Sequence, residues 1–292
     1  MIDKECVGII GGDMRMQYLA EYFSVSGHIV KLAGHDDNNT MCSDIILCND
    51  VKDVADNSDI IILGLPAIKR DEINSPLYSG IILKDELIES LKPGKLVYGG
   101  IINKSDRDEF QKTGALLTDY CEIDEFAWLN AVSTAEGCIE IIMTNTVETI
   151  NGLPCLIFGF GRIGKILADM LKKMNADVTV AARRENVLNE AEAFGFNTLN
   201  LRDLDKKLSD EYVIINTIPS MILNDKLLVK CKNKLIIDLA SMPGGVDFNY
   251  AAENGIKVIH ALGIPGKYAP KSFAKNVYNV ILRTMVEECI CG

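Results

Sequence analysis

A glycine-rich segment between an apolar run and a helical pattern constrains the fold of this chain more than any other feature. Residues 153–158 (LPCLIF) form an apolar run of strand length, and residues 162–174 (RIGKILADMLKKM) have helical periodicity. The glycines between them allow a tight turn, close approach of a phosphate and close packing of the helix on the strand. The N-terminus of the helix then offers free N–H donors to the phosphate. With another strand predicted at residues 177–182, this segment predicts a dinucleotide site. The residues expected to hold the dinucleotide here are Gly159, Phe160, Gly161, Arg162, Ile163 and Gly164.

The end of the strand predicted at residues 177–182 bears on which dinucleotide binds. NAD sites commonly place an Asp or Glu about 20 residues past the glycines, where it accepts hydrogen bonds from the ribose hydroxyls. Here Arg183 and Arg184 occupy that place, and no carboxylate occurs before Glu185. A guanidinium can clamp a 2′-phosphate through two charge-assisted hydrogen bonds, whereas a carboxylate would repel it. The pair favours NADP(H), with NAD(H) as the second choice. The alternative is that both arginines are only solvated residues at a strand end.

Composition limits the other kinds of function. A chain of 292 residues is long enough for two domains, and its net charge of −11 argues against nucleic acid or an anionic membrane as a partner. No stretch approaches the roughly 18 apolar residues of a membrane span, and the N-terminus enters a predicted strand rather than a signal peptide. Nine cysteines without a C-x-x-C motif suit a reducing compartment, and three histidines are too few for a histidine-rich metal site. We therefore expect a cytoplasmic protein without a metal.

Alternating strands and short helices predict an α/β fold with two doubly wound parallel-sheet domains. We expect a flavodoxin-like substrate domain over residues 1–121, an interdomain helix over residues 122–150 and a Rossmann dinucleotide-binding domain over residues 151–270. The apolar pattern of residues 271–292 predicts a C-terminal helix that packs back on the first domain. Two domains of this kind leave an interdomain cleft, where ligands bind at the carboxyl ends of the strands.

Three polar residues are candidates for binding a substrate in this cleft. Arg15 follows a glycine turn that we interpret as a copy of the fold without a cofactor; its guanidinium either holds a substrate carboxylate or lies on the surface. Glu136 is either the partner of Ser133 in a capping box that opens a helix, or a carboxylate that positions or deprotonates the substrate. Lys271 begins the last predicted helix, where a lysine opposes the macrodipole, so carboxylate binding explains it better than stability does.

Two loops in the second domain are candidates for contact with the nicotinamide. Each follows an apolar strand on the same edge of the sheet as the glycine turn, and proline or glycine ends each strand. Each loop could be only a turn, but the occurrence of both on that edge favours a cofactor role. The expected contacts are Thr217, Ile218, Pro219, Ala240 and Ser241.

In this order and spacing, these features resemble the family of dipicolinate synthase A subunits of spore-forming bacteria over essentially the whole chain. The matching segments are residues 10–13 with Arg15, 134–137, 159–162, 182–183, 215–220, 238–241 with 243–245, and 265–266 with 269–271.

The resemblance implies NADP-dependent oxidation of dihydrodipicolinate, or of its 4-hydroxytetrahydro precursor with loss of water, to pyridine-2,6-dicarboxylate. It also implies sporulation as the setting, the mother-cell cytoplasm as the location and the flavoprotein-like B subunit of dipicolinate synthase as the partner. With a small dicarboxylate as substrate, we expect Asp13, Arg15, Thr134 and Lys271 to bind it and Glu136 and Lys271 to act in catalysis. We also expect a homo-oligomer. The plan is similar to alanine dehydrogenase and the 2-hydroxyacid dehydrogenases, so another such enzyme, or an idle NADP(H)-binding protein, remains an alternative.

Overall fold

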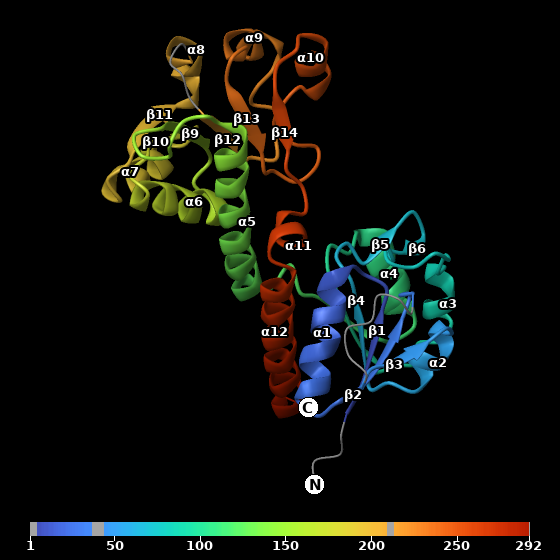
Figure 1. Cartoon of the computed structure of the whole chain (residues 1–292). Coiled ribbons are helices and arrows are strands. Elements are labelled where there is room, and N and C mark those ends of the chain that lie inside the picture. Colours follow the sequence, from blue (N-terminus) through green and yellow to red (C-terminus); the bar gives the residue numbers. More distant parts are fainter. Residues whose placement is uncertain (1–4, 37–43, 209–212, 292) are drawn as a thin grey trace. The chain divides into compact units, whose positions relative to one another are not determined.

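The computed structural model describes residues 5–36, 44–208 and 213–291, and these fall into two compact units (Figure 1). Unit 1 comprises Met1–Leu129 and Ala269–Gly292, and unit 2 comprises Asn130–Tyr268. The whole of unit 2 is therefore inserted between two parts of unit 1.

Unit 1 is built on a six-stranded parallel sheet with the strand order β3-β2-β1-β4-β7-β8. The central strands are almost fully buried because helices cover both faces of the sheet, which is why they are apolar throughout. The strands are β1 (Cys6–Ile10), β2 (Ile29–Ala33), β3 (Ile46–Cys48), β4 (Ile60–Leu63), β7 (Leu96–Gly99) and β8 (Leu116–Asp119), with a separate hairpin of β5 (Ile68–Lys69) and β6 (Glu72–Ile73). The helices are α1 (Met14–Val25), α2 (Val51–Asp56), α3 (Lys84–Ile88), α4 (Lys104–Lys112) and α12 (Pro270–Cys291).

The last helix, α12, supplies part of the core of unit 1. It packs along α1 (Figure 1), and Phe273, Val277 and Ile281 at helical spacing are buried in the same cluster as Phe23 of α1. The ring of Phe273 also meets that of Phe126 edge-on, with 5.3 Å between centroids. The apolar stripe of the tail therefore completes a core that begins at the other end of the sequence.

Unit 2 contains a second six-stranded parallel sheet, with the order β11-β10-β9-β12-β13-β14. Its strands are β9 (Pro154–Phe158), β10 (Asp177–Ala182), β11 (Asn197–Asn200), β12 (Val213–Asn216), β13 (Leu235–Asp238) and β14 (Val258–His260). The helices are α5 (Asp124–Asn145), within which the boundary between the units falls, α6 (Arg162–Lys173), α7 (Glu185–Ala193), α8 (Leu204–Lys207), α9 (Asp225–Leu228), α10 (Phe248–Glu253) and α11 (Ile264–Tyr268). Two parallel sheets with alternating helices confirm the predicted fold class.

The prediction that Ser133 to Glu136 open a helix is wrong. These residues lie in the interior of α5, which already begins at Asp124. Thr134 Oγ1 donates to the carbonyl of Asn130, one turn earlier in the same helix (2.9 Å). A capping role therefore does not explain Glu136.

The longest helices, α5 and α12, have 22 residues each. In the described part of the chain neither these nor any other helix has the length and apolar character needed to cross a bilayer.

Candidate functional site

The glycine-rich turn lies between β9 and α6, at the carboxyl edge of the sheet of unit 2. The order of this sheet reverses between β9 and β12, and ligands of doubly wound sheets bind at that switch point. Gly159 has a φ of +94°, and a Cβ there would come within 2.6 Å of Thr217 Oγ1. A Cβ on Gly164 would collide with the carbonyl oxygen of Gly159, so this glycine lets the helix pack on its strand. Around Gly161 the space is open to 4 Å, which leaves room for a phosphate at the helix N-terminus.

The other residues of the turn differ in what they can offer a ligand. Phe160 is buried and meets the ring of Phe196 edge-on at 5.7 Å, so its ring belongs to the core of unit 2. Arg162 is exposed at the first position of α6, whereas Ile163 is half-buried against the core. The first turn of α6 has no acidic residue, so its positive dipole end is not neutralised.

Arg183 and Arg184 follow β10, and both are exposed. Arg183 Nη2 lies 3.4 Å from Ser220 Oγ, which connects the loop after β10 to the loop after β12. Glu185, the first carboxylate after the arginines, accepts a hydrogen bond from Asn200 Nδ2 (2.7 Å). The end of β10 thus presents two exposed arginines, one of which reaches the loop that follows β12.

A buried polar pair joins the loops after β12 and β13; both residues lie in segments that the sequence singled out, but the bond between them was not predicted. Asn216 and Asp238 are fully buried neighbours in the sheet, and Asn216 Nδ2 donates to Asp238 Oδ1 (2.8 Å). Asn216 Oδ1 accepts from the N–H of Ile218, and Asp238 accepts from the N–H groups of Ala240 and Gly245 (3.1, 3.0 and 2.8 Å). The pair thereby fixes both loops that carry Thr217, Ile218, Pro219, Ala240 and Ser241. A signal was present, because each of these apolar strands ends in one polar residue.

Unit 1 has a polar group at the switch point of its own sheet, between β1 and β4. Arg15 is only 6% exposed, so the alternative of a surface arginine is wrong. Its Nε and Nη2 donate to the two oxygens of Asp13, and Nη2 also donates to the carbonyl of Leu65, all at 2.8 Å. The guanidinium lies over the ring of Phe273, 4.6 Å from its centroid. No described residue accepts from Nη1, which leaves one edge of the cation available to an anion.

Asp13 has two functions in this arrangement. Its Oδ1 also accepts from the N–H of Arg15 (3.0 Å), so the carboxylate caps α1. The preceding turn is closed, because the N–H of Gly12 donates to the carbonyl of Asn74 (2.6 Å). A phosphate at this helix N-terminus would meet the Asp13 carboxylate, in contrast to the open turn at Gly161.

The remaining predicted substrate residues are divided between the two units. Lys271 lies on the first turn of α12, with Nζ 4.0 Å from Glu21 Oε2 and 5.6 Å from the centroid of Tyr18. Thr134 and Glu136 belong to unit 2. Thr134 is buried with its hydroxyl bonded inside α5, whereas Glu136 is exposed and meets no polar partner in the described chain.

His35, which sequence reasoning also missed, lies at the end of β2 beside the glycine turn of unit 1. Its Nε2 donates to the carbonyl of Gly11 (2.9 Å), and Nδ1 accepts from Gln17 Nε2 (3.3 Å), a tautomer assigned from these partners. Burial lowers the pKa of His35, and the bond to Gly11 only partly offsets this effect. The ring is therefore neutral at pH 7.

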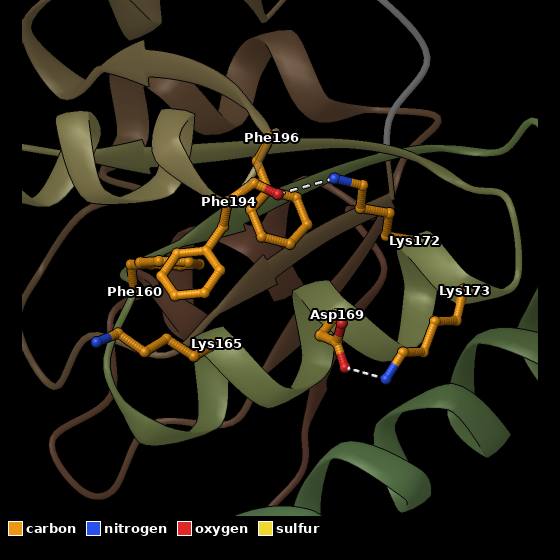
Figure 2. Close-up of a pocket in the computed structure, with 7 residues that line it drawn as sticks. All are labelled: Phe160, Lys165, Asp169, Lys172, Lys173, Phe194 and Phe196. Atoms are coloured by element: carbon orange, nitrogen blue, oxygen red, sulfur yellow. Dashed lines mark hydrogen bonds and ion pairs between the residues drawn. The ribbon is translucent and has the colours of Figure 1, made fainter.

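A separate hollow of about 320 Å³ lies beside α6 (Figure 2). Its cations are already engaged: Lys172 Nζ donates to the carbonyls of Phe194 and Gly195 (2.8 and 2.9 Å), and Lys173 pairs with Asp169 (2.7 Å). Of the residues predicted to bind the cofactor, only Phe160 lines it, so the hollow is distinct from the glycine turn. The lining residues are Phe160, Lys165, Asp169, Lys172, Lys173, Phe194 and Phe196. Within the described residues no group of three or more His, Cys, Asp or Glu side chains could hold a metal ion.

Comparison with known proteins agrees with this arrangement. Residues 136–240 match the family model of the NAD-binding domain of D-isomer-specific 2-hydroxyacid dehydrogenases, and the fold is similar to that of transhydrogenase from Sinorhizobium meliloti (TM-score 0.65, 15% identity, 96% and 94% of the two chains). The molecule is thus a two-domain oxidoreductase of the class that binds a nicotinamide dinucleotide. Residues 6–121 match the model of the N-terminal domain of the dipicolinate synthase A subunit, and the chain is 31% identical to the dipicolinate synthase A subunit of Bacillus subtilis over 96% of both chains. The chain therefore belongs to the family of dipicolinate synthase A subunits.

A crystal structure of the dipicolinate synthase A subunit from Bacillus halodurans is also similar to this chain. The two share 29% identity and a TM-score of 0.88, over 97% of this chain and 98% of the other. The similarity therefore extends over both units.

Proposed function

We propose that the chain oxidises dihydrodipicolinate, or its 4-hydroxytetrahydro precursor after loss of water, to pyridine-2,6-dicarboxylate, with NADP⁺ as the hydride acceptor. The observation that carries the proposal is the open glycine turn in a chain of this family: Gly161 leaves space for a pyrophosphate, and Arg183 stands at the end of β10. Bound there, NADP⁺ would accept a hydride at its nicotinamide ring. The product is proposed from the names of the relatives, and the cofactor site is proposed from the residues of this chain.

The arginines after β10 support NADP⁺ over NAD⁺. Two exposed arginines follow β10, where the adenosine ribose of a bound dinucleotide would lie, and Glu185 is held by Asn200. A 2′-phosphate would find charge-assisted donors there rather than a carboxylate. The buried pair Asn216–Asp238 would keep the two loops on the nicotinamide side in place.

The substrate is a flat ring with two carboxylates, and the chain offers cations for both. In this proposal Arg15 receives one carboxylate on its free Nη1 edge, and Asp13 fixes the orientation of the guanidinium. Lys271, which is more than half exposed, receives the other carboxylate by leaving its long contact with Glu21. The proton that leaves as the ring becomes aromatic needs an acceptor, and the exposed carboxylate of Glu136 is proposed for that role. Since aromatisation drives the reaction, the protein mainly has to orient the ring and exclude water.

We further propose that the chain works with the flavoprotein-like B subunit, because its relatives are named as the A subunit of a synthase. The test is anaerobic mixing of the purified chain with the cyclised precursor and either NADP⁺ or NAD⁺, with and without this B subunit, followed at 340 nm. We expect absorbance to rise with the chain alone and faster with NADP⁺. If turnover requires the B subunit, and the rate is the same with the Arg15→Ala variant of the chain, the chain is an idle cofactor-binding protein. No turnover under any condition would contradict the proposed reaction.

A further inference from the structure

An outward-facing isoleucine with a strained backbone lies at the carboxyl edge of the sheet of unit 1. Ile101 follows β7 and has a φ of +52°, a left-handed conformation that a β-branched residue rarely adopts. The residue is 61% exposed. An apolar group that remains largely in water gains too little from folding to account for a strained backbone. Strained residues of this kind cluster at active sites, ligand clamps and switch regions.

A buried carboxylate imposes the conformation. Asp119, at the end of β8, is 5% exposed and accepts from the N–H groups of Ile101 (3.2 Å) and Ile102 (2.8 Å). It also accepts from the N–H of Cys121 (2.9 Å). Two successive N–H groups converge on one carboxylate because the backbone turns left-handed between them. The side chain of Ile101 is thereby held outward.

Hydrogen bonds connect this loop to Arg15. The N–H of Gly100 donates to the carbonyl of Gly64 (3.1 Å), and the N–H of Ala67 donates to the carbonyl of Gly100 (2.8 Å). The carbonyl of Leu65, between these two contacts, accepts from Arg15 Nη2 (2.8 Å). The neighbouring strands β1, β4 and β7 therefore present Arg15, Leu65 and Ile101 in one connected set of loops.

We propose that Ile101 forms the apolar wall of the substrate site in unit 1. Its side chain contacts the flat face of the substrate ring, and Arg15 receives one of the ring's carboxylates. A flat ring with anionic ends needs both an apolar surface and a cation, and these loops supply one of each. The inference rests on the proposed function and adds a substrate-contacting residue that no motif indicated.

The test compares three variants by thermal unfolding and by steady-state kinetics with NADP⁺ and the cyclised precursor. Ile101→Gly relieves the strain, so the Tm should rise by about 2–4 °C, while kcat/KM falls about tenfold or more through a higher KM. Ile101→Val keeps a branched apolar wall and should stay within about threefold of the wild-type kcat/KM. Arg70→Gly is the matched control: Arg70 has a φ of +53° in the exposed turn between β5 and β6, so the variant should gain stability without a change in kcat/KM.

Unchanged kcat/KM in Ile101→Gly would overturn the inference, as would an equal loss in Arg70→Gly. If Ile101→Gly folds poorly, the Ile101→Asn variant replaces it in the test, because asparagine tolerates the left-handed conformation. A wild-type kcat/KM in Ile101→Asn would overturn the inference.

Calorimetry of dipicolinate binding to the same proteins distinguishes a failure of the inference from a failure of the proposed function. A wild-type chain that neither binds dipicolinate nor oxidises the precursor contradicts the function and with it the inference. If the wild-type chain binds dipicolinate and oxidises the precursor, and Ile101→Gly does so equally well, the inference alone is contradicted.

Discussion

Arg183 and the residues near it allow the choice of dinucleotide to be tested at a single position. In Arg183→Asp a carboxylate replaces the guanidinium at the end of β10, where it would repel a 2′-phosphate and accept from ribose hydroxyls. We expect the ratio of kcat/KM for NADP⁺ to that for NAD⁺ to fall by about tenfold or more, since a charged hydrogen bond contributes about 1.5–3 kcal/mol. Steady-state kinetics with both cofactors measures the ratio.

The control for Arg183→Asp makes the same change in charge elsewhere in unit 2. Lys173→Asp lies at the far end of α6 from the glycine turn and should leave the ratio unchanged. An unaltered ratio in Arg183→Asp would remove the argument for a phosphate clamp.

His35 gives the stability of unit 1 a dependence on pH. Because burial lowers the folded pKa of His35, the unfolded chain binds its proton first as the pH falls. The stabilisation is complete above the unfolded pKa of about 6.5 and is lost as the pH decreases from there to the folded value. We expect the wild-type Tm to decrease between pH 7 and pH 5.5, and His35→Gln to show a smaller decrease in differential scanning fluorimetry. Equal slopes in the two proteins would contradict this account.

Individual residues also show what could be predicted from the sequence. Arg15 was recognised as a candidate, but its burial under Phe273 could not be predicted, because Phe273 comes from the far end of the chain. Ile101 and Asp119 gave no local signal, since their relation depends on the register between β7 and β8. Glycines 159, 161 and 164 were predictable because a strand, a turn and a helix adjacent in sequence determine their positions.

At the scale of elements, the glycine turn predicts different effects for two glycine-to-alanine substitutions, one on stability and one on cofactor affinity. Gly164→Ala places a Cβ against the Gly159 carbonyl, so we expect the free energy of unfolding to fall by about 1–3 kcal/mol in urea titrations. Gly161→Ala meets no atom in the protein and should cost less than about 1 kcal/mol. Its Cβ would fill the space left for the pyrophosphate, so we expect calorimetry to show an affinity for NADP⁺ weaker by about tenfold. Equal affinities for wild type and Gly161→Ala would place the phosphates elsewhere.

Elements with a strong local pattern were predicted to within one residue of the bounds that the structure has, as at residues 153–158, 162–174 and 177–182. The start of α5 was mispredicted because Ser133 and Glu136 have the spacing of a cap. The preceding turns are nevertheless helical, and Phe126 is buried there against Phe273. A contact with a segment distant in sequence therefore outweighed a local capping signal.

At the scale of the whole molecule, the separate cores predict separate responses of the two units. In unit 1 the side chain of Lys84 is 5% exposed and pairs with Glu109 (2.7 Å), Asp106 (2.9 Å) and Asp71 (3.3 Å). Burial alone would lower the pKa of Lys84, but these three hydrogen bonds outweigh it and raise the pKa well above its usual value. Lys84→Met leaves the buried Asp106 without its cation and should destabilise unit 1 by about 3 kcal/mol.

Scanning calorimetry tests this separation. We expect Lys84→Met to lower the transition of unit 1, and saturating NADP⁺ to raise the transition of unit 2. A variant of an exposed pair, Lys92→Met, should leave both transitions nearly unchanged, because surface ion pairs contribute little. A single transition that Lys84→Met and NADP⁺ both shift would show that the units unfold as one.

The placement of α12 in the core of unit 1 has a consequence for synthesis on the ribosome. Unit 2 emerges complete while unit 1 still lacks its closing helix, so the inserted unit can mature first. Until α12 has left the ribosome, the apolar face of α1 that α12 later covers is left open to solvent or to a chaperone. α1 is therefore made well before the helix that completes its core.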